Sequence, residues 1–114
     1  MFKNEERALK EWLQLYLYHG ADHLYLIDDG SDDRSVSVLD PFIAKGVVTL
    51  FQEKNHPYYL ARQHTLYNRY VLPHIEEAHW LLMVDLDEFM WSPRSINLCE
   101  VLAELDHVGQ IQMS

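Results

Sequence analysis

Short apolar segments alternate with amphipathic ones along this chain, and that alternation limits the folds that are open to it. Residues 23–27, 47–51 and 80–84 are each short, apolar and rich in side chains that favour strands. Helical patterns lie between them, as in residues 9–17, where apolar side chains recur three and four positions apart. Strands that alternate with helices predict an α/β fold, with a mostly parallel sheet flanked by helices.

The helical segments carry recognisable start and stop signals. Asn4 can cap the first helix, and Gly20 is a plausible stop for it. The remaining expected elements are a weaker helix at residues 35–45 interrupted by Pro41, helices at residues 58–73 and 96–103, and the opening of a strand at residues 110–113.

The chain is long enough for one domain, which we place at residues 1–114. No apolar run approaches the roughly 20 residues of a membrane span, so we expect no membrane segment in this chain. The first residues turn polar almost at once, and no signal peptide is visible. Cys99 is the single cysteine, so an internal disulfide is excluded. We expect a cytoplasmic protein, or one in the Golgi lumen or at a membrane if the chain belongs to a longer eukaryotic protein.

The charge balance narrows the classes of partner. The net charge is -9, which repels a phosphate backbone and argues against nucleic acid as a partner. An acidic protein still binds a nucleoside diphosphate when a divalent cation stands between the two, and carboxylate clusters commonly hold that cation.

Two acidic clusters, residues 28–33 and 85–88, follow directly after expected strands. Ligands of parallel sheets bind beyond the carboxyl ends of the strands, so the two clusters are expected to converge on one edge. Asp85 and Asp87, one residue apart in a loop, are suited to hold Mn²⁺ or Mg²⁺, which prefer oxygen ligands. Such a cation would neutralise a diphosphate leaving group. The alternative for this pair is a solvated acidic loop.

Asp28 and Asp29 form the second candidate pair. Their carboxylates can accept hydrogen bonds from a base imide or a ribose hydroxyl. The alternative is a turn between a strand and a helix, in which an acidic or hydroxyl side chain caps the next helix. We favour that alternative for three neighbouring residues, Asp32, Asp33 and Ser35.

The basic and amide side chains near the start of the chain are weaker candidates. Lys3 could meet a phosphate and Asn4 a ribose or base, but a solvated helix start explains Lys3, Asn4 and Glu5 as well. Arg62 is a candidate phosphate contact, with a solvated helix position as its alternative.

The seven histidines raise a zinc alternative, which we disfavour. His19 and His23 straddle the expected helix stop at Gly20 and should not share one helical face. Sequence motifs of phosphate-binding loops, dinucleotide sites, serine hydrolases and zinc proteases are not found.

Five stretches resemble the glycosyltransferase family 2-like and family 92 proteins: residues 3–5, 11–12, 19–23, 28–33 and 80–89. Their order and spacing make the resemblance more specific than any single motif. It implies the nucleotide-binding half of a Rossmann-like GT-A fold, a nucleotide-sugar donor and a divalent cation, with residues 85–87 as the Asp-x-Asp motif.

The resemblance assigns seven residues to the donor site. Lys3, Asn4 and Glu5 would line the nucleotide pocket. Asp28 and Asp29 would contact the nucleoside, and Asp85 and Asp87 would hold the metal and the diphosphate.

The resemblance predicts a glycosyltransferase that moves a sugar from a nucleotide sugar, expected to be a UDP-sugar, to a saccharide or glycan acceptor. The family normally begins with a complete strand, of which Met1 and Phe2 remain, and continues into an acceptor half that supplies the catalytic base. We therefore name no catalytic base, and for Glu88 we favour a structural role. The alternative function is a non-catalytic nucleotide-binding fragment. A nucleotidyltransferase is a third possibility, but its glycine-rich basic loop is not found.

Overall fold

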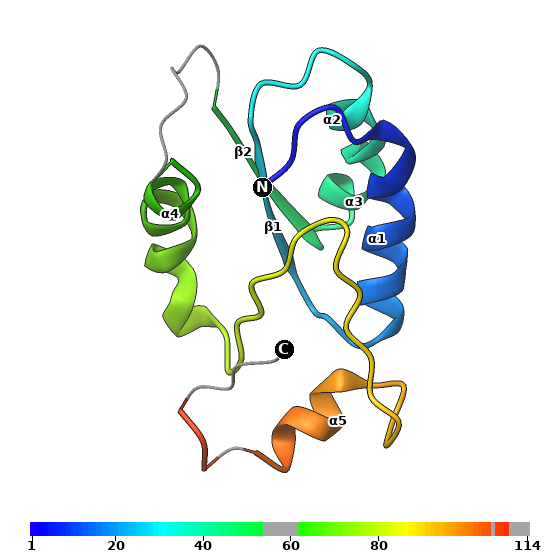
Figure 1. Ribbon diagram of the computed structural model, residues 1–114, viewed down its shortest axis with the longest axis vertical. Coiled ribbons are helices and arrows are strands. Elements are labelled where there is room, and N and C mark those ends of the chain that lie inside the picture. Colours follow the sequence, from blue (N-terminus) through cyan, green and yellow to red (C-terminus); the bar gives the residue numbers. More distant parts are fainter. Residues whose placement is uncertain (54–61, 106, 110–114) are drawn as a thin grey trace.

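Two parallel strands form the centre of the fold, which we describe from a computed structural model for residues 1–53, 62–105 and 107–109. Strand β1, Leu24–Asp28, pairs with strand β2, Val48–Gln52, so that Leu24 lies opposite Val48 (Figure 1). On the other side of β1, Phe2 forms an isolated parallel bridge with Asp28. The expected parallel arrangement of residues 23–27 and 47–51 is confirmed.

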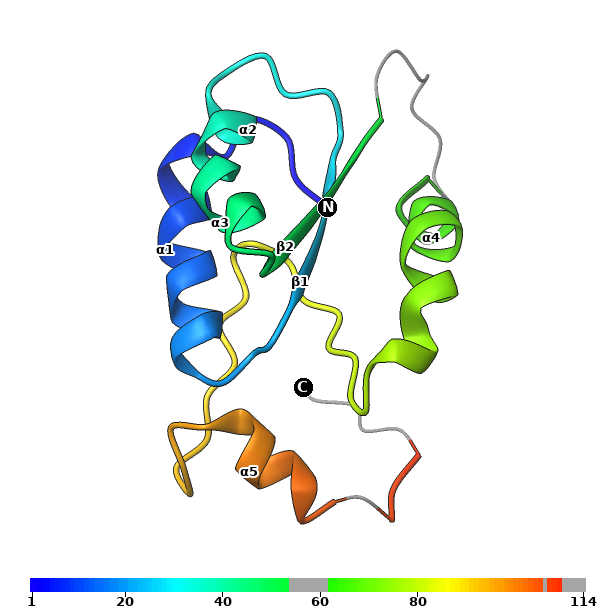
Figure 2. The ribbon, with the colours of Figure 1, turned by 180° about the vertical axis from the view of Figure 1, so that it is seen from behind.

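Helices cover both sides of this strand pair (Figures 1 and 2). On one side lie α1, α2 and α3, and on the other side lies α4 with the helical turns that follow it. The helical elements are α1 (Glu6–Tyr18), α2 (Ser35–Val38), α3 (Asp40–Ala44), α4 (Arg62–Leu66), the π-helical turn η1 (Tyr67–Val71), the 3-10 turn η2 (Leu72–Glu77) and α5 (Leu98–Ala103). The arrangement is a mixed α/β fold. No helix among the described residues is long and apolar enough to span a bilayer.

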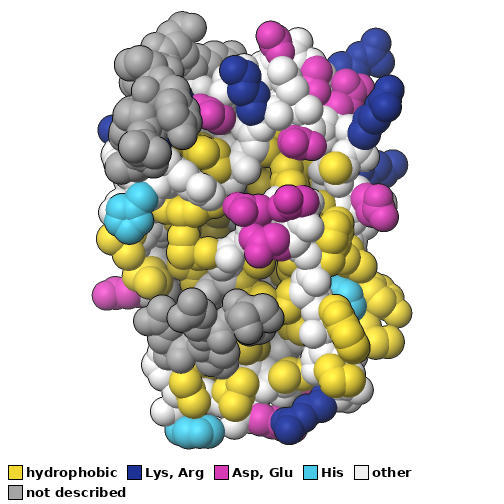
Figure 3. Space-filling view, in the orientation of Figure 1, with side chains coloured by type: hydrophobic (Ala, Val, Ile, Leu, Met, Phe, Trp, Pro, Cys, Tyr) yellow, Lys and Arg dark blue, Asp and Glu magenta, His cyan; other side chains and the backbone are white. Residues whose placement is uncertain are grey.

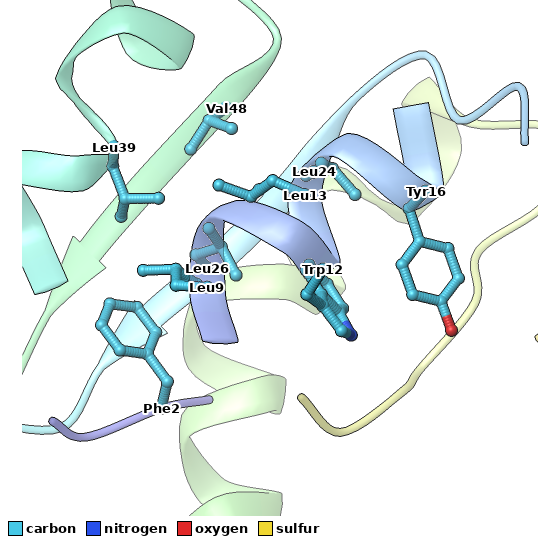
Figure 4. Close-up of a cluster of buried hydrophobic side chains, with 9 residues drawn as sticks. All are labelled: Phe2, Leu9, Trp12, Leu13, Tyr16, Leu24, Leu26, Leu39 and Val48. Atoms are coloured by element: carbon cyan, nitrogen blue, oxygen red, sulfur yellow. The ribbon is translucent and has the colours of Figure 1, made fainter. Parts of the chain in front are cut away.

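Helix α1 supplies most of the larger core. Leu9 and Leu13, one turn apart, are fully buried against Leu26 of β1 and Val48 of β2 (Figure 4). The helix ends at Tyr18 because Gly20 follows with a φ of 96°, a left-handed conformation that suits glycine. The expected first helix and its stop are therefore confirmed.

A smaller core lies on the opposite face of the sheet. Side chains alternate across a strand, so Leu26 points into the larger core while Ile27 packs with Leu66 and Val71. This second core fixes α4 and η1 against β1. Arg62, the first residue of α4, is thereby held close to the carboxyl end of β1.

The expected third strand, residues 80–84, is wrong: these described residues form no strand. A strand needs a neighbouring backbone to pair with, and the described chain places only the single bridging residue Phe2 on the free side of β1. Leu81 and Val84 still pack against the two cores. The apolar side chains of this segment are therefore in part explained by packing against the cores rather than by membership of a sheet.

Three helix predictions need correction. Asn4 does not cap α1: Glu5 occupies that position, and its side chain makes no capping hydrogen bond. The helix expected at residues 35–45 is two short helices, α2 and α3, because the chain turns at Leu39 and restarts with Pro41 in the first turn of α3.

The helix expected at residues 58–73 is a succession of three types of turn. Within its described part it changes from α-helix to π-helix at Tyr67 and to 3-10 helix at Leu72, next to Pro73. Residues 58–61, like the strand expected at residues 110–113, lie outside the described residues. The helix expected at residues 96–103 is confirmed as α5, capped by the side chain of Asn97.

Candidate functional site

A pocket of about 440 Å³ lies beside the carboxyl end of β1. It brings together segments that are far apart in the sequence: the start of the chain, the residue after β1, the start of α4 and the second acidic cluster. The lining residues are Met1, Phe2, Lys3, Glu5, Ala8, Asp29, Gln63, Asp85, Leu86 and Asp87. Five of the seven residues expected at a donor site therefore line one pocket, and the two acidic clusters converge there as expected.

The acidic turn, residues 85–88, has a defined internal geometry. The Glu88 amide donates to the Asp85 carbonyl at 3.0 Å, and the Asp85 amide donates to the Glu88 carboxylate at 2.8 Å. Glu88 is thus occupied in closing the turn, which agrees with the structural role favoured for it. The side chains of Asp85 and Asp87 remain available to the pocket.

Gln63 of α4 orients the first of these carboxylates. Its amide nitrogen donates to Asp85 Oδ1 at 3.3 Å and to the Tyr67 hydroxyl at 2.9 Å. Burial raises the pKa of Tyr67, and the nearby charges of Asp85 and Glu88 raise it further. The sequence pattern predicted no role for Gln63, because a polar residue near the start of a helix is usually solvated.

Asp29 lines the pocket and forms an ion pair with Arg62 of α4. The Arg62 side chain is only 9% exposed and that of Asp29 24%, so the pair is largely shielded from water. Arg62 was expected either as a phosphate contact or as a solvated residue. The structure instead places it in a pair with Asp29, where it neutralises one of the acidic groups at the pocket edge.

Asp28, by contrast, does not line the pocket. It is fully buried, and its Oδ1 accepts a hydrogen bond of 2.9 Å from the Ser31 amide. The second oxygen, Oδ2, has no hydrogen-bond partner among the described residues. A nucleoside could reach this oxygen only if the chain that covers it moved, so its expected contact stays a prediction.

Asn4 is also turned away from the pocket. Its side-chain oxygen accepts from the backbone amides of Asp32 and Asp33 at 2.9 and 3.3 Å, and the Asn4 backbone N–H donates to the Ser31 hydroxyl. These bonds join the start of the chain to the loop after β1. The nucleotide contact expected of Asn4 stays a prediction, while its role in fixing this loop is visible. The capping favoured for Asp33 is confirmed in part, since Oδ1 accepts from the Ser35 amide at 2.8 Å.

The surface around the pocket is acidic at its centre and apolar around it. Figure 3 shows a group of acidic side chains in the middle of this face, where Figure 1 places the yellow segment of the chain. The pocket is lined by four carboxylates and, among the side chains, by the ammonium of Lys3. An arrangement of this sign attracts cations and repels a bare diphosphate.

The pocket carboxylates fit a divalent cation only together with other ligands. Among the described residues no group of three or more His, Cys, Asp or Glu side chains is placed to hold a metal. Mg²⁺, however, is commonly bound through one or two carboxylates together with substrate phosphates and water. Asp85 and Asp87 in one pocket fit that mode, which depends on a phosphate ligand to complete the coordination.

The histidines support no zinc site in the described part of the chain. His19 Nδ1 lies 2.7 Å from the Ile96 carbonyl, and His23 Nε2 lies 2.6 Å from the Thr49 hydroxyl. The two side chains therefore have different partners, as their separation by Gly20 led us to expect.

Comparison with known proteins supports the family 92 part of the resemblance found in the sequence. The family model of glycosyltransferase family 92 matches residues 1–113. The chain belongs to glycosyltransferase family 92. This family 92 chain is 26% identical over 111 residues to a glycosyltransferase family 92 protein of Ricinus communis. The match covers 96% of the chain and 19% of that relative, so the chain spans about a fifth of the relative's length. No solved structure gives a significant match to the family 92 chain.

Proposed function

We propose that this chain forms the donor-binding part of a metal-assisted glycosyltransferase that uses a nucleotide sugar, with a UDP-sugar as the donor. The observation that carries the proposal is the meeting of Asp85, Asp87, Asp29 and Lys3 around one pocket. Membership of family 92 supports a glycosyltransferase as the class of the whole protein.

The roles of the side chains follow from their charge and position. Asp85 and Asp87 would hold Mn²⁺ or Mg²⁺, which when bound supplies positive charge to the departing diphosphate. Lys3, which also lines the pocket, would add a second positive group for a phosphate oxygen. Asp29, held in place by Arg62, would accept from a ribose hydroxyl or a base N–H.

The acceptor would be a saccharide or glycan whose hydroxyl attacks the anomeric carbon. The residues lining the pocket include no group that we assign as the base for that hydroxyl. This proposal therefore covers donor binding and stabilisation of the leaving group, and it leaves acceptor activation to other parts of the full protein.

Calorimetry with UDP tests the proposal. The wild-type chain should bind UDP in the presence of Mn²⁺ and should lose at least about tenfold in affinity in EDTA. Asp85→Asn and Asp87→Asn should each remove the effect of Mn²⁺. Asp22→Asn, which removes an exposed charge in the loop between α1 and β1, is the matched control and should behave as wild type. A folded wild-type chain without UDP affinity in either condition would contradict the proposal.

A second candidate function is donor binding without transfer. The observation that favours it is that the chain corresponds to only 19% of its family 92 relative. The two candidates are separated by incubating the chain with a UDP-sugar, Mn²⁺ and a saccharide acceptor. Release of UDP at a rate above the protein-free control supports transfer or hydrolysis, whereas Mn²⁺-dependent binding without UDP release supports the second candidate.

A further inference from the structure

Two aromatic side chains of α1 hold the acidic turn from outside. The Trp12 indole nitrogen donates to the Asp85 carbonyl at 3.1 Å. The Tyr16 hydroxyl donates to the Glu88 carbonyl at 2.9 Å and accepts from the Met90 amide at 3.0 Å. These three bonds join α1 to both ends of the acidic turn, across sequence separations of 72 to 74 residues.

The two anchors are themselves firmly placed. Trp12 and Tyr16 lie one helical turn apart, both are buried, and their ring centroids are 4.8 Å apart (Figure 4). Burial raises the pKa of Tyr16, so its hydroxyl remains protonated and able to donate at neutral pH. Each aromatic ring belongs to the larger core, while its polar tip reaches the turn.

The acidic turn has little other support from the backbone. Within the described residues 80–91 there is no strand, and the backbone–backbone hydrogen bond found there is the one from Glu88 to Asp85 inside the turn. Sheet pairing would normally fix the position of residues that follow a strand. Here the side chains of Trp12 and Tyr16 supply hydrogen bonds in its place, together with the packing of Leu86 and Met90 on the larger core.

We propose that Trp12 and Tyr16 are positioning residues for the cation site, and that their hydrogen bonds to the acidic turn set how Asp85 and Asp87 face the pocket. This inference rests on the proposed function, since it assumes that the two carboxylates hold a divalent cation. Neither aromatic residue touches the cation or the donor. They act through the main chain of the turn that carries the ligands.

The physical reason is the narrow geometry that such a cation demands. Mg²⁺ requires oxygen ligands at about 2.0–2.1 Å in near-octahedral geometry, so two carboxylates on a loosened turn must be ordered again when it binds. Ligands need to be held within about 0.5 Å of their productive places by a supporting shell. Loss of the anchors should therefore weaken cation binding more than it weakens contacts with the nucleoside.

Tyr16→Phe tests the inference, because it removes both hydrogen bonds of the hydroxyl and keeps the ring in the core. Free Mn²⁺ is titrated by electron paramagnetic resonance with the chain and saturating UDP. We expect Mn²⁺ affinity to fall about 3- to 10-fold, the size of effect expected from losing one or two net hydrogen bonds. UDP affinity in EDTA should stay within twofold of wild type, which a general loosening of the core would not allow.

Tyr25→Phe is the matched control. It also removes a hydroxyl hydrogen bond, of 3.0 Å to Glu77, but from a tyrosine that packs on the smaller core and, within the described residues, makes no hydrogen bond to the acidic turn. It should leave Mn²⁺ affinity within twofold of wild type. Trp12→Phe is the second test variant if Tyr16→Phe does not fold, since it removes the bond to Asp85 alone.

The outcomes separate this inference from the proposed function. Wild-type Mn²⁺ binding with a selective loss in Tyr16→Phe or Trp12→Phe supports both. Wild-type binding with unchanged Mn²⁺ affinity in a folded variant overturns the positioning role and leaves the proposed function intact. Absence of Mn²⁺ binding by the folded wild-type chain overturns both.

Discussion

Arg62 and Asp29 form an ion pair that joins the start of α4 to the carboxyl end of β1 at the edge of the pocket. Arg62→Met should lower the free energy of unfolding by about 2 kcal/mol, between the values typical of exposed and of buried pairs. The reason is that the Asp29 carboxylate, only 24% exposed, would lose its partner.

A double-mutant cycle with Asp29→Asn checks this prediction by urea denaturation. The double variant should lose less stability than the sum of the two single variants, because the second change removes the charge that the first left unpaired. Additive losses would show that the two side chains do not interact in solution.

Asn4 has a left-handed backbone, with a φ of 53°, and its side chain accepts from the amides of Asp32 and Asp33. Asn4→Ala should destabilise the chain by about 2 kcal/mol, since it loses these bonds and places an ordinary Cβ in a conformation that asparagine and glycine tolerate better. Asn4→Gly loses the same bonds without that backbone cost, so it should be the more stable of the two variants. Equal stability of the two, measured by thermal unfolding, would argue against the backbone contribution.

The hydrogen bonds of Asp33 should make the stability of the fold depend on pH in the acidic range. Its hydrogen bonds, first with the Ser35 side chain and also with the amides of Ser35 and Glu6, lower the pKa of its carboxyl. The stabilisation is fully present above the pKa of the unfolded chain, about 3.9, and is lost as the pH falls through the lower folded value.

Asp33→Asn should therefore be less stable than wild type at neutral pH, and the difference should shrink as the pH is lowered below about 4. Urea denaturation at a series of pH values measures this. Asp32→Asn, at the next position along the chain, is the control. A difference between wild type and Asp33→Asn that grows in acid would contradict the assigned direction.

Leu13 and Leu72 offer a test of where the core lies. Leu13 is fully buried in the larger core, whereas Leu72 is 51% exposed. Leu13→Ala should cost about 2–5 kcal/mol, the range for a buried leucine whose removal leaves a cavity, and Leu72→Ala clearly less. Comparable losses in urea denaturation would mean that α1 does not pack as described.

Local patterns in the sequence were sufficient to predict α1, β1, β2 and α5, because each depends on periodicity and on a nearby stop or cap. Residues 80–84 misled the prediction, since an apolar run shows burial but does not reveal whether a partner strand is present. The mixed turns that begin at Arg62 were predicted as part of one helix at residues 58–73, because apolar side chains recur at helical spacing there.

For the candidate site too, local sequence patterns predicted some residues and missed others. Asp29, Asp85 and Asp87 were predicted to converge because the carboxyl ends of parallel strands share an edge. They do line one pocket, but the reason holds only for Asp29, which follows β1, since the described residues 80–84 form no strand. The role of Asn4 depends on bonds to residues 28 and 29 positions away and on a left-handed backbone, neither of which a local pattern shows. Trp12 and Tyr16 look like ordinary core residues in the sequence, and only their polar tips reveal their link to the acidic turn.

The central claim is that Asp85 and Asp87 hold a divalent cation that bridges to a diphosphate. Paramagnetic broadening of backbone amide signals by Mn²⁺, recorded on the ¹⁵N-labelled chain with UDP, tests it most directly. The account predicts selective broadening at Lys3, Asp29 and residues 85–87, with the signals of α5 unaffected. Broadening that is absent from residues 85–87, or that is centred on Glu100 of α5, would contradict it.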